Sequence, residues 1–320
     1  MRLTTRVRAA LLATLALAGV AAQAAQASPR PAHPGTVVVG HAGLQVPCGA
    51  DGTRLQADWY FPGSGSRRAT GVVWLQHGFF RTRRNVATLA RAVAARTRAI
   101  VVAPTVSSNP FAAEGCWING TPMQRAVARM FAGRSALQRS ADAAKGRHVP
   151  LPRAFVLSGH SAGGNLATAA AGFTTLPGGA VADLRAVVLY DPVDSGGAMP
   201  EALGRLTGGA DRPVLAITAP PSACNAFGSG TRALVTARPG RFVGVQLAGG
   251  SHVDAEGPDS DPLARGLCGS PIQANVEALR SIASGWITNA LTGSSIGIVG
   301  GTPGDRIPVD GATAVVLPAG

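Results

Sequence analysis

The sequence predicts an α/β protein whose mostly parallel central sheet carries helices on both faces. Apolar strand-like runs alternate with segments of helical spacing, which is typical of parallel strands joined by crossover helices. The clearest strand–turn–helix unit spans residues 154–171, where a glycine-rich turn separates an apolar run from an alanine-rich stretch. We see no internal repeat and no boundary of a second domain, so we expect one domain over residues 28–291.

The expected elements follow one another along this domain. Short apolar runs bounded by Gly, Pro or polar clusters predict strands, at 36–39, 55–61, 71–75, 99–103, 155–158, 186–190, 214–218 and 242–247. Apolar residues recur at helical spacing in three segments, at 86–93, about 120–144 and 274–290. Residues 292–320 are rich in glycine with short Val/Ile runs, and the pattern assigns them no element.

Residues 1–27 have the pattern of a secretory signal peptide. A start with three arginines precedes an apolar stretch at 9–22, and residues 25–27 (Ala-Gln-Ala) offer a small-x-small cleavage site, with 22–24 as the second choice. The apolar stretch is too short and too rich in alanine for a stable membrane span, although a retained amphipathic anchor is an alternative. We therefore expect an exported protein.

The charge balance is strongly basic, with 29 Lys and Arg against 16 Asp and Glu and a formal net charge of +13. The arginines are scattered, which indicates a solvated basic surface; a weak attraction to anionic polymers or membrane surfaces is the alternative. Aromatic residues make up only 5% and do not interleave with the arginines, so we expect no nucleic-acid partner. Nothing in the sequence indicates the oligomeric state.

Four cysteines in an exported chain predict two disulfides, for which three connectivities exist. Cys224 follows the strand at 214–218 and Cys268 lies in the loop after His252, so both belong near the same end of the sheet. We therefore expect a Cys224–Cys268 bond, and the remaining pair, Cys48–Cys116, follows by elimination only. Because no Cys-x-x-Cys spacing and no histidine cluster occurs, we expect neither a metal site nor a cofactor.

The segment Gly159-His160-Ser161-Ala162-Gly163 lies between an expected strand and an expected helix, which is the context required of a nucleophile elbow. A serine on such a sharp turn projects its hydroxyl clear of the backbone only if the residues two before and two after lack bulk. The motif therefore predicts Ser161 as a nucleophile. A plain glycine-rich turn is the alternative, because the chain has 42 glycines.

A serine nucleophile needs a base, and in the elbow topology the order along the chain is serine, acid, histidine. Of six histidines, only His252 lies beyond the elbow, in a glycine-rich loop just after an expected strand. We expect His252 to be the base, with an ordinary exposed loop histidine as the alternative. His160 should point away from the serine oxygen, and His77 should shape the turn at its strand end.

The acid must orient the imidazole, so it belongs at the carboxyl end of a strand near His252. The segment after the penultimate strand, residues 219–225, contains no carboxylate. Asp191 ends the preceding strand and is followed by a proline, so we expect it to be the acid. Asp194 and loop acids such as Asp254 are the alternatives.

An oxyanion hole needs two backbone N–H groups aimed at the developing charge. One should belong to Ala162, directly after the nucleophile. The other should come from the turn at His77-Gly78-Phe79, and we expect the N–H of Phe79, because Gly78 frees the backbone to turn there. Phe79 and its neighbour could also wall an acyl pocket, with ordinary core packing as the alternative.

These motifs resemble those of the α/β-hydrolases, and within that fold the chain is similar to chlorophyllase-like and polyester-hydrolase-like serine esterases. The likeness spans residues 55–290 and is carried by the segments 75–79, 101–104, 159–164 and 189–194, with 250–254 as a weaker fifth. In chlorophyllases the aspartate of the Asp-Pro-Val segment, here Asp191, is the proposed triad acid. Ala162 stands where chlorophyllases carry arginine, which argues against chlorophyll as the substrate.

The sequence therefore predicts a secreted serine carboxylic-ester hydrolase, an esterase or lipase, with a Ser161–His252–Asp191 triad and an acyl-enzyme intermediate. Its expected substrate is a small ester, a lipid or a polyester. Two alternatives remain, an acyltransferase that uses an alcohol in place of water and a non-catalytic binding protein that retains the fold.

Overall fold

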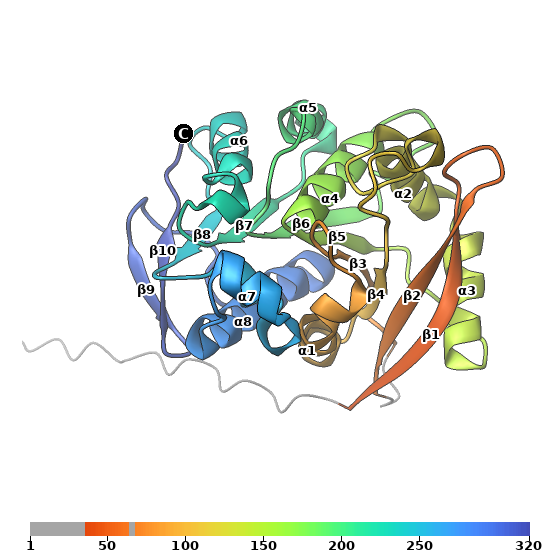
Figure 1. Cartoon of the computed structure of the whole chain (residues 1–320), viewed down its shortest axis with the longest axis horizontal. Helices are drawn as coiled ribbons and strands as arrows, with labels where there is room; N and C mark the ends of the chain where they lie inside the picture. The colour runs from red at the N-terminus through yellow and green to blue at the C-terminus, as the bar shows by residue number, and fades with distance from the viewer. Residues whose placement is uncertain (1–35, 64–67) are drawn as a thin grey trace, which may run out of the picture. The chain divides into compact units, whose positions relative to one another are not determined.

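A computed structural model describes residues 36–63 and 68–320 (Figure 1). The expected signal peptide at 1–27 lies outside the described residues and stays a prediction. Within the described part, one sheet has the strand order β1-β2-β4-β3-β5-β6-β7-β8-β10-β9. Its strands are β1 (Val37–Val46), β2 (Thr53–Pro62), β3 (Val72–Gln76), β4 (Ile100–Pro104), β5 (Phe155–His160), β6 (Leu184–Tyr190), β7 (Val214–Thr218), β8 (Gly244–Leu247), β9 (Arg306–Val309) and β10 (Ala312–Val316).

The strands from β4 to β8 run parallel, so the prediction of a mostly parallel sheet is confirmed. β1 and β2 pair antiparallel at one side of this parallel set, and β10 and β9 pair antiparallel at the other. The helices are α1 (Ala87–Thr97), α2 (Thr121–Gly133), α3 (Ser135–Lys145), α4 (Ala162–Phe173), α5 (Ala198–Arg205), α6 (Ser229–Ala237), α7 (Pro262–Cys268) and α8 (Gln273–Thr292). No helix of residues 36–63 or 68–320 is both long enough and apolar enough to cross a membrane.

The sheet has two apolar cores, one on each face, because side chains alternate between the two faces along each strand. In β3, Trp74 belongs to the core that contains side chains of α2 to α6, whereas Val73 and Leu75 belong to the core on the opposite face, with side chains of α1 and α8. Successive side chains of a strand point to opposite faces, so the fully buried run in β3 needs a helical layer on both sides. Figure 1 shows these layers above and below the sheet.

The helices α5, α6 and α7 lie where the sequence pattern named no element, and two further stretches differ from its interpretation. The helical segment expected at about 120–144 is two helices, α2 and α3, because Arg134 between them adopts a left-handed conformation with φ 50°. The segment 292–320, to which the pattern assigned no element, contains β9 and β10. β10 pairs with β8, whose carboxyl end leads into the loop that carries His252.

Candidate active site

The elbow around Ser161 is a sharply strained turn between β5 and α4. Ser161 has φ 56° and ψ −124°, a conformation rarely adopted by a residue with a side chain. A Cβ atom on Gly159 would overlap the carbonyl oxygen of Gly163, and one on Gly163 would overlap the carbonyl oxygens at the end of β3. Both glycines are therefore required for α4 to begin directly behind the serine.

The carboxyl ends of β6 and β8 bring Asp191 and His252 together. The Nδ1 atom of His252 lies 2.6 Å from Oδ2 of Asp191, and the two residues are only 7% and 4% exposed. Because a carboxylate oxygen accepts there, Nδ1 carries a proton and Nε2 of the neutral ring is free to accept one. The loop of His252 is also attached to the elbow, since His160 donates from Nε2 to the His252 carbonyl oxygen at 2.8 Å.

A buried amide that sequence reasoning missed completes the surroundings of Asp191. Asn225 is fully buried, and its Nδ2 lies 3.2 and 3.1 Å from the two carboxylate oxygens of Asp191. The backbone N–H of Ala219 donates to Oδ1 at 3.1 Å. Asn225 follows β7, in the segment 219–225 that contains no carboxylate. An amide in the place of the expected carboxylate was the signal available in the sequence.

The two alternative acids have other partners. Asp194 accepts the backbone N–H of Met199 at 2.9 Å, at the start of α5. Asp254 accepts the N–H groups of Ser251 at 2.8 Å and Ile272 at 2.9 Å, and burial raises its pKa. Of the three candidate carboxylates, Asp191 is therefore the one that contacts the imidazole.

The loop after β3 lies directly against Ser161. A Cβ built on Gly78 would lie 3.1 Å from Cβ of Ser161. His77 fixes this loop, because its Nδ1 donates to the Gly78 carbonyl oxygen at 2.8 Å and its Nε2 accepts the Val106 N–H at 3.0 Å. Burial lowers the pKa of His77 to about 4, so the ring is neutral and structural. The N–H of Phe80 donates to Ser108 Oγ at 2.8 Å, so it is already occupied within this loop.

An apolar rim surrounds this end of the sheet. Its large side chains are exposed and lie in the segments that follow β3, β4, β7 and β8: Phe79, Phe80, Phe111, Phe227, Leu263 and Leu267. Phe80 and Phe227 also have left-handed φ values of 55° and 54°, although they are 76% and 65% exposed. A bulky residue is strained in that region, so these two phenylalanines are unfavourable both in their backbone conformation and in the exposure of their rings.

Both predicted cysteine pairs are joined in the structure. Cys224 and Cys268 have Cα atoms 5.6 Å apart and connect the segment after β7 to the end of α7. Cys48 and Cys116 have Cα atoms 5.9 Å apart and connect the hairpin of β1 and β2 to the loop after β4. Each disulfide therefore fastens a loop that contributes to the apolar rim.

Solved structures of esterases share this architecture. Two variant crystal structures of the esterase rPPE are 18% and 17% identical to this chain, cover 80% of it and 84% and 83% of their own chains, and have TM-scores of 0.52 and 0.54. A structure from a study of two fungal esterases of Rhizomucor miehei is 15% identical, covers 82% of this chain and 86% of its own, and has a TM-score of 0.53. Neither a protein-family model nor a curated protein sequence matches this chain. At these identities the likeness concerns the fold, and it agrees with the predicted topology: the chain has the α/β-hydrolase fold.

Proposed function

We propose that this protein is a serine carboxylic-ester hydrolase that uses Ser161 as nucleophile, His252 as general base and Asp191 as the orienting acid. The observation that carries the proposal is the 2.6 Å contact between His252 Nδ1 and Asp191 Oδ2, in a loop attached to the elbow itself. The esterases that share the fold support the same class of reaction.

The reaction proceeds through two acyl transfers. The Ser161 oxygen forms a bond to the ester carbonyl carbon while its proton passes to Nε2 of His252, and Asp191 stabilises the resulting imidazolium. The N–H groups of Phe79 and Ala162 donate to the developing oxyanion. Collapse breaks the bond to the alkoxy oxygen, and the departing alcohol takes the proton from His252. Water then repeats the sequence and releases the acid and free Ser161.

The apolar rim indicates which esters fit this site. Exposed aromatic and aliphatic side chains on several loops around the serine favour apolar acyl or alcohol groups over charged ones. We further propose that the protein works outside the cytoplasm, because two disulfides are typical of oxidising compartments.

A labelling experiment tests the proposed nucleophile. A fluorophosphonate should modify the protein once, at Ser161, and Ser161→Ala should lose both labelling and hydrolysis of p-nitrophenyl esters. Ser158→Ala is the matched control, because this buried serine lies within β5 and should leave labelling unchanged. Labelling at another serine, or ester hydrolysis that survives Ser161→Ala, would show that the assignment is wrong.

A further inference from the structure

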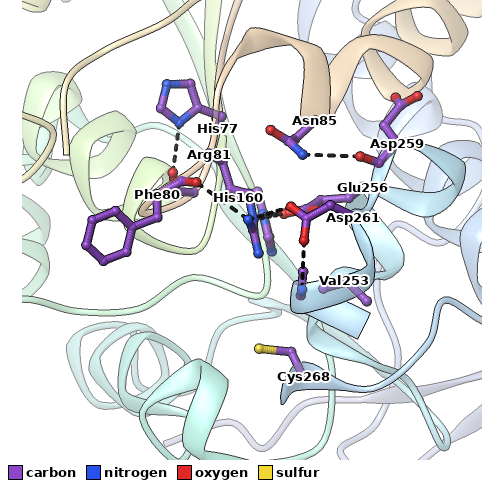
Figure 2. Close-up of polar contacts among 12 residues, drawn as sticks. His77, Phe80, Arg81, Asn85, His160, Val253, Glu256, Asp259, Asp261 and Cys268 are labelled. Carbon is purple, nitrogen blue, oxygen red and sulfur yellow. Dashed lines mark hydrogen bonds and ion pairs between the residues drawn. The ribbon is translucent and has the colours of Figure 1, made fainter. Parts of the chain in front are cut away.

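Two buried polar side chains lie beside the catalytic constellation and have no part in the proton transfers described above. His160 is 2% exposed and belongs to the elbow, and Glu256 is 1% exposed and follows the short helical turn His252–Ala255. Figure 2 shows the two side chains directed toward each other, with Arg81 beside them. Each contains a buried atom, Nδ1 of His160 and Oε2 of Glu256, that has no hydrogen-bond partner within the described part of the chain.

The proton on the His160 ring can be located from its partner. The His252 carbonyl oxygen only accepts, so Nε2 of His160, at 2.8 Å, must carry the hydrogen. Burial, followed by the neighbouring His252 and more weakly by Arg81 and His77, lowers the pKa of His160 well below its usual value. The ring is therefore neutral, and Nδ1 presents a lone pair toward Oε1 of Glu256, 3.7 Å away.

Besides His160, Glu256 shares its surroundings with four other charged or polar groups. Arg81 Nε lies 3.0 Å from Oε1, and the same guanidinium contacts Asp261 Oδ2 at 2.8 Å (Figure 2). Burial raises the pKa of Glu256 to about 7 and Asp261 also raises it, whereas Arg81, His252 and Ser260 act in the opposite direction. The single guanidinium is divided between two carboxylates, which leaves Glu256 incompletely neutralised.

We propose that His160 and Glu256 form a positioning pair that exchanges one proton with solvent and fixes the His252 loop against the elbow. When the carboxyl group carries the proton, its O–H donates to Nδ1 of His160, and a small shift from 3.7 Å closes this bond. When the proton is lost, a carboxylate faces a lone pair and only Arg81 holds it. The inference rests on the proposed function, since the pair acts through His252.

The packing explains why this pair would influence the reaction. His160 contacts the loop of His252 through Nε2, and Gly78 packs so closely on it that an added Cβ would lie 3.2 Å from Nδ1. The same ring lies with its centroid 4.7 Å from that of His252. A change at Nδ1 is therefore transmitted to the base and to the expected oxyanion loop together.

Substitutions at Glu256 separate positioning from simple packing. Glu256→Gln keeps the shape and supplies an amide donor to Nδ1 at every pH, so its kcat should match that of the wild type below pH 7 and should not decline above it. Glu256→Ala leaves Nδ1 without a donor and should lower kcat about 10-fold at acidic and neutral pH, with little change in KM. Glu277→Gln, at an ion-paired surface carboxylate of α8, is the matched control and should change neither value.

A second measurement does not depend on hydrolytic activity. In a Ser161→Ala background, the ¹⁵N chemical shift of His160 Nδ1 should titrate near pH 7, and Glu256→Gln should remove that titration. A wild-type-like pH profile in both folded Glu256 variants, or a His160 Nδ1 shift that does not respond to Glu256→Gln, would overturn the pair. Loss of hydrolysis or labelling at Ser161 concerns the proposed function instead, so the two failures are distinguishable.

Discussion

Replacing Asp191 with asparagine tests how the hydrogen bonds around the expected acid orient His252. Oδ1 accepts from the Ala219 N–H at 3.1 Å, Oδ2 lies 2.6 Å from His252 Nδ1, and Asn225 Nδ2 lies 3.2 Å from Oδ1 and 3.1 Å from Oδ2. Asparagine has a single carbonyl oxygen, which the Ala219 N–H will attract to the Oδ1 side, where Asn225 Nδ2 can also donate to it. In Asp191→Asn the NH₂ group is therefore expected to face His252.

That arrangement selects the wrong tautomer of the base. An NH₂ group only donates, so His252 must present the lone pair of Nδ1 and carry its hydrogen on Nε2, where it cannot accept the Ser161 proton. The equivalent change in a serine protease lowers kcat by about 10⁴-fold, and we expect a loss of that order, about 5 kcal/mol in activation free energy.

The assay is kcat for a short p-nitrophenyl ester, measured beside the thermal midpoint of unfolding. Asp194→Asn is the control, because Asp194 accepts a backbone N–H of α5 and should lose little activity. If Asp191→Asn melts normally and retains activity within about 10-fold of wild type, the tautomer argument is refuted. Asp254 would then be the next carboxylate to replace.

Three further outcomes are expected. Asn225→Ala should lower kcat about 10- to 100-fold at unchanged fold, because Asp191 loses a buried donor; an unaffected kcat would show that the amide is not needed. The pKa of Glu256 is about 7 in the folded chain and exceeds the ordinary value of 4.5, so protonation stabilises the fold fully below pH 4.5. This contribution of about 3 kcal/mol is lost as the pH rises through 7. In urea unfolding, Glu256→Gln should lack this loss of stability between pH 4.5 and 7. Replacing Cys224 and Cys268 by serine should cost about 2–5 kcal/mol in unfolding free energy, and equal urea midpoints would contradict this.

The parallel sheet was predictable because each of its strands is a short apolar run that can be recognised from its own residues. Apolar runs such as 72–75 and 155–157 require burial on both faces, and that requirement is visible without any tertiary information. The break at Arg134 was missed, although Gly133 before it is a poor helix former and Ser135 after it is a residue type common at helix starts. The strands after residue 300 were also hidden, because pairing with β8 is a tertiary contact and their short runs have no pattern of their own.

For the site, the sequence identified residue types and their order, and the expectation that His252 meets Asp191 agrees with the observed contact. The catalytic roles of these residues, and of Phe79 and Ala162, remain predictions until measured. Asn225 was missed although an amide stands where a carboxylate was expected, because a buried amide is recognisable as a partner only when its carboxylate is known. The surroundings of Glu256 likewise depend on loops that are far apart in the chain.

The added strands β9 and β10 affect how the protein behaves at high concentration. An edge strand offers unpaired N–H and C=O groups to any other chain, and without β10 that edge would be β8, whose residues Gly244–Leu247 include no charge. β9 instead ends the sheet with only four residues, which include Arg306 and Pro308. A proline has no N–H to donate, and a charged side chain disfavours stacking against a second sheet edge. Removal of these two strands should therefore promote aggregation as well as disturb the loop of His252.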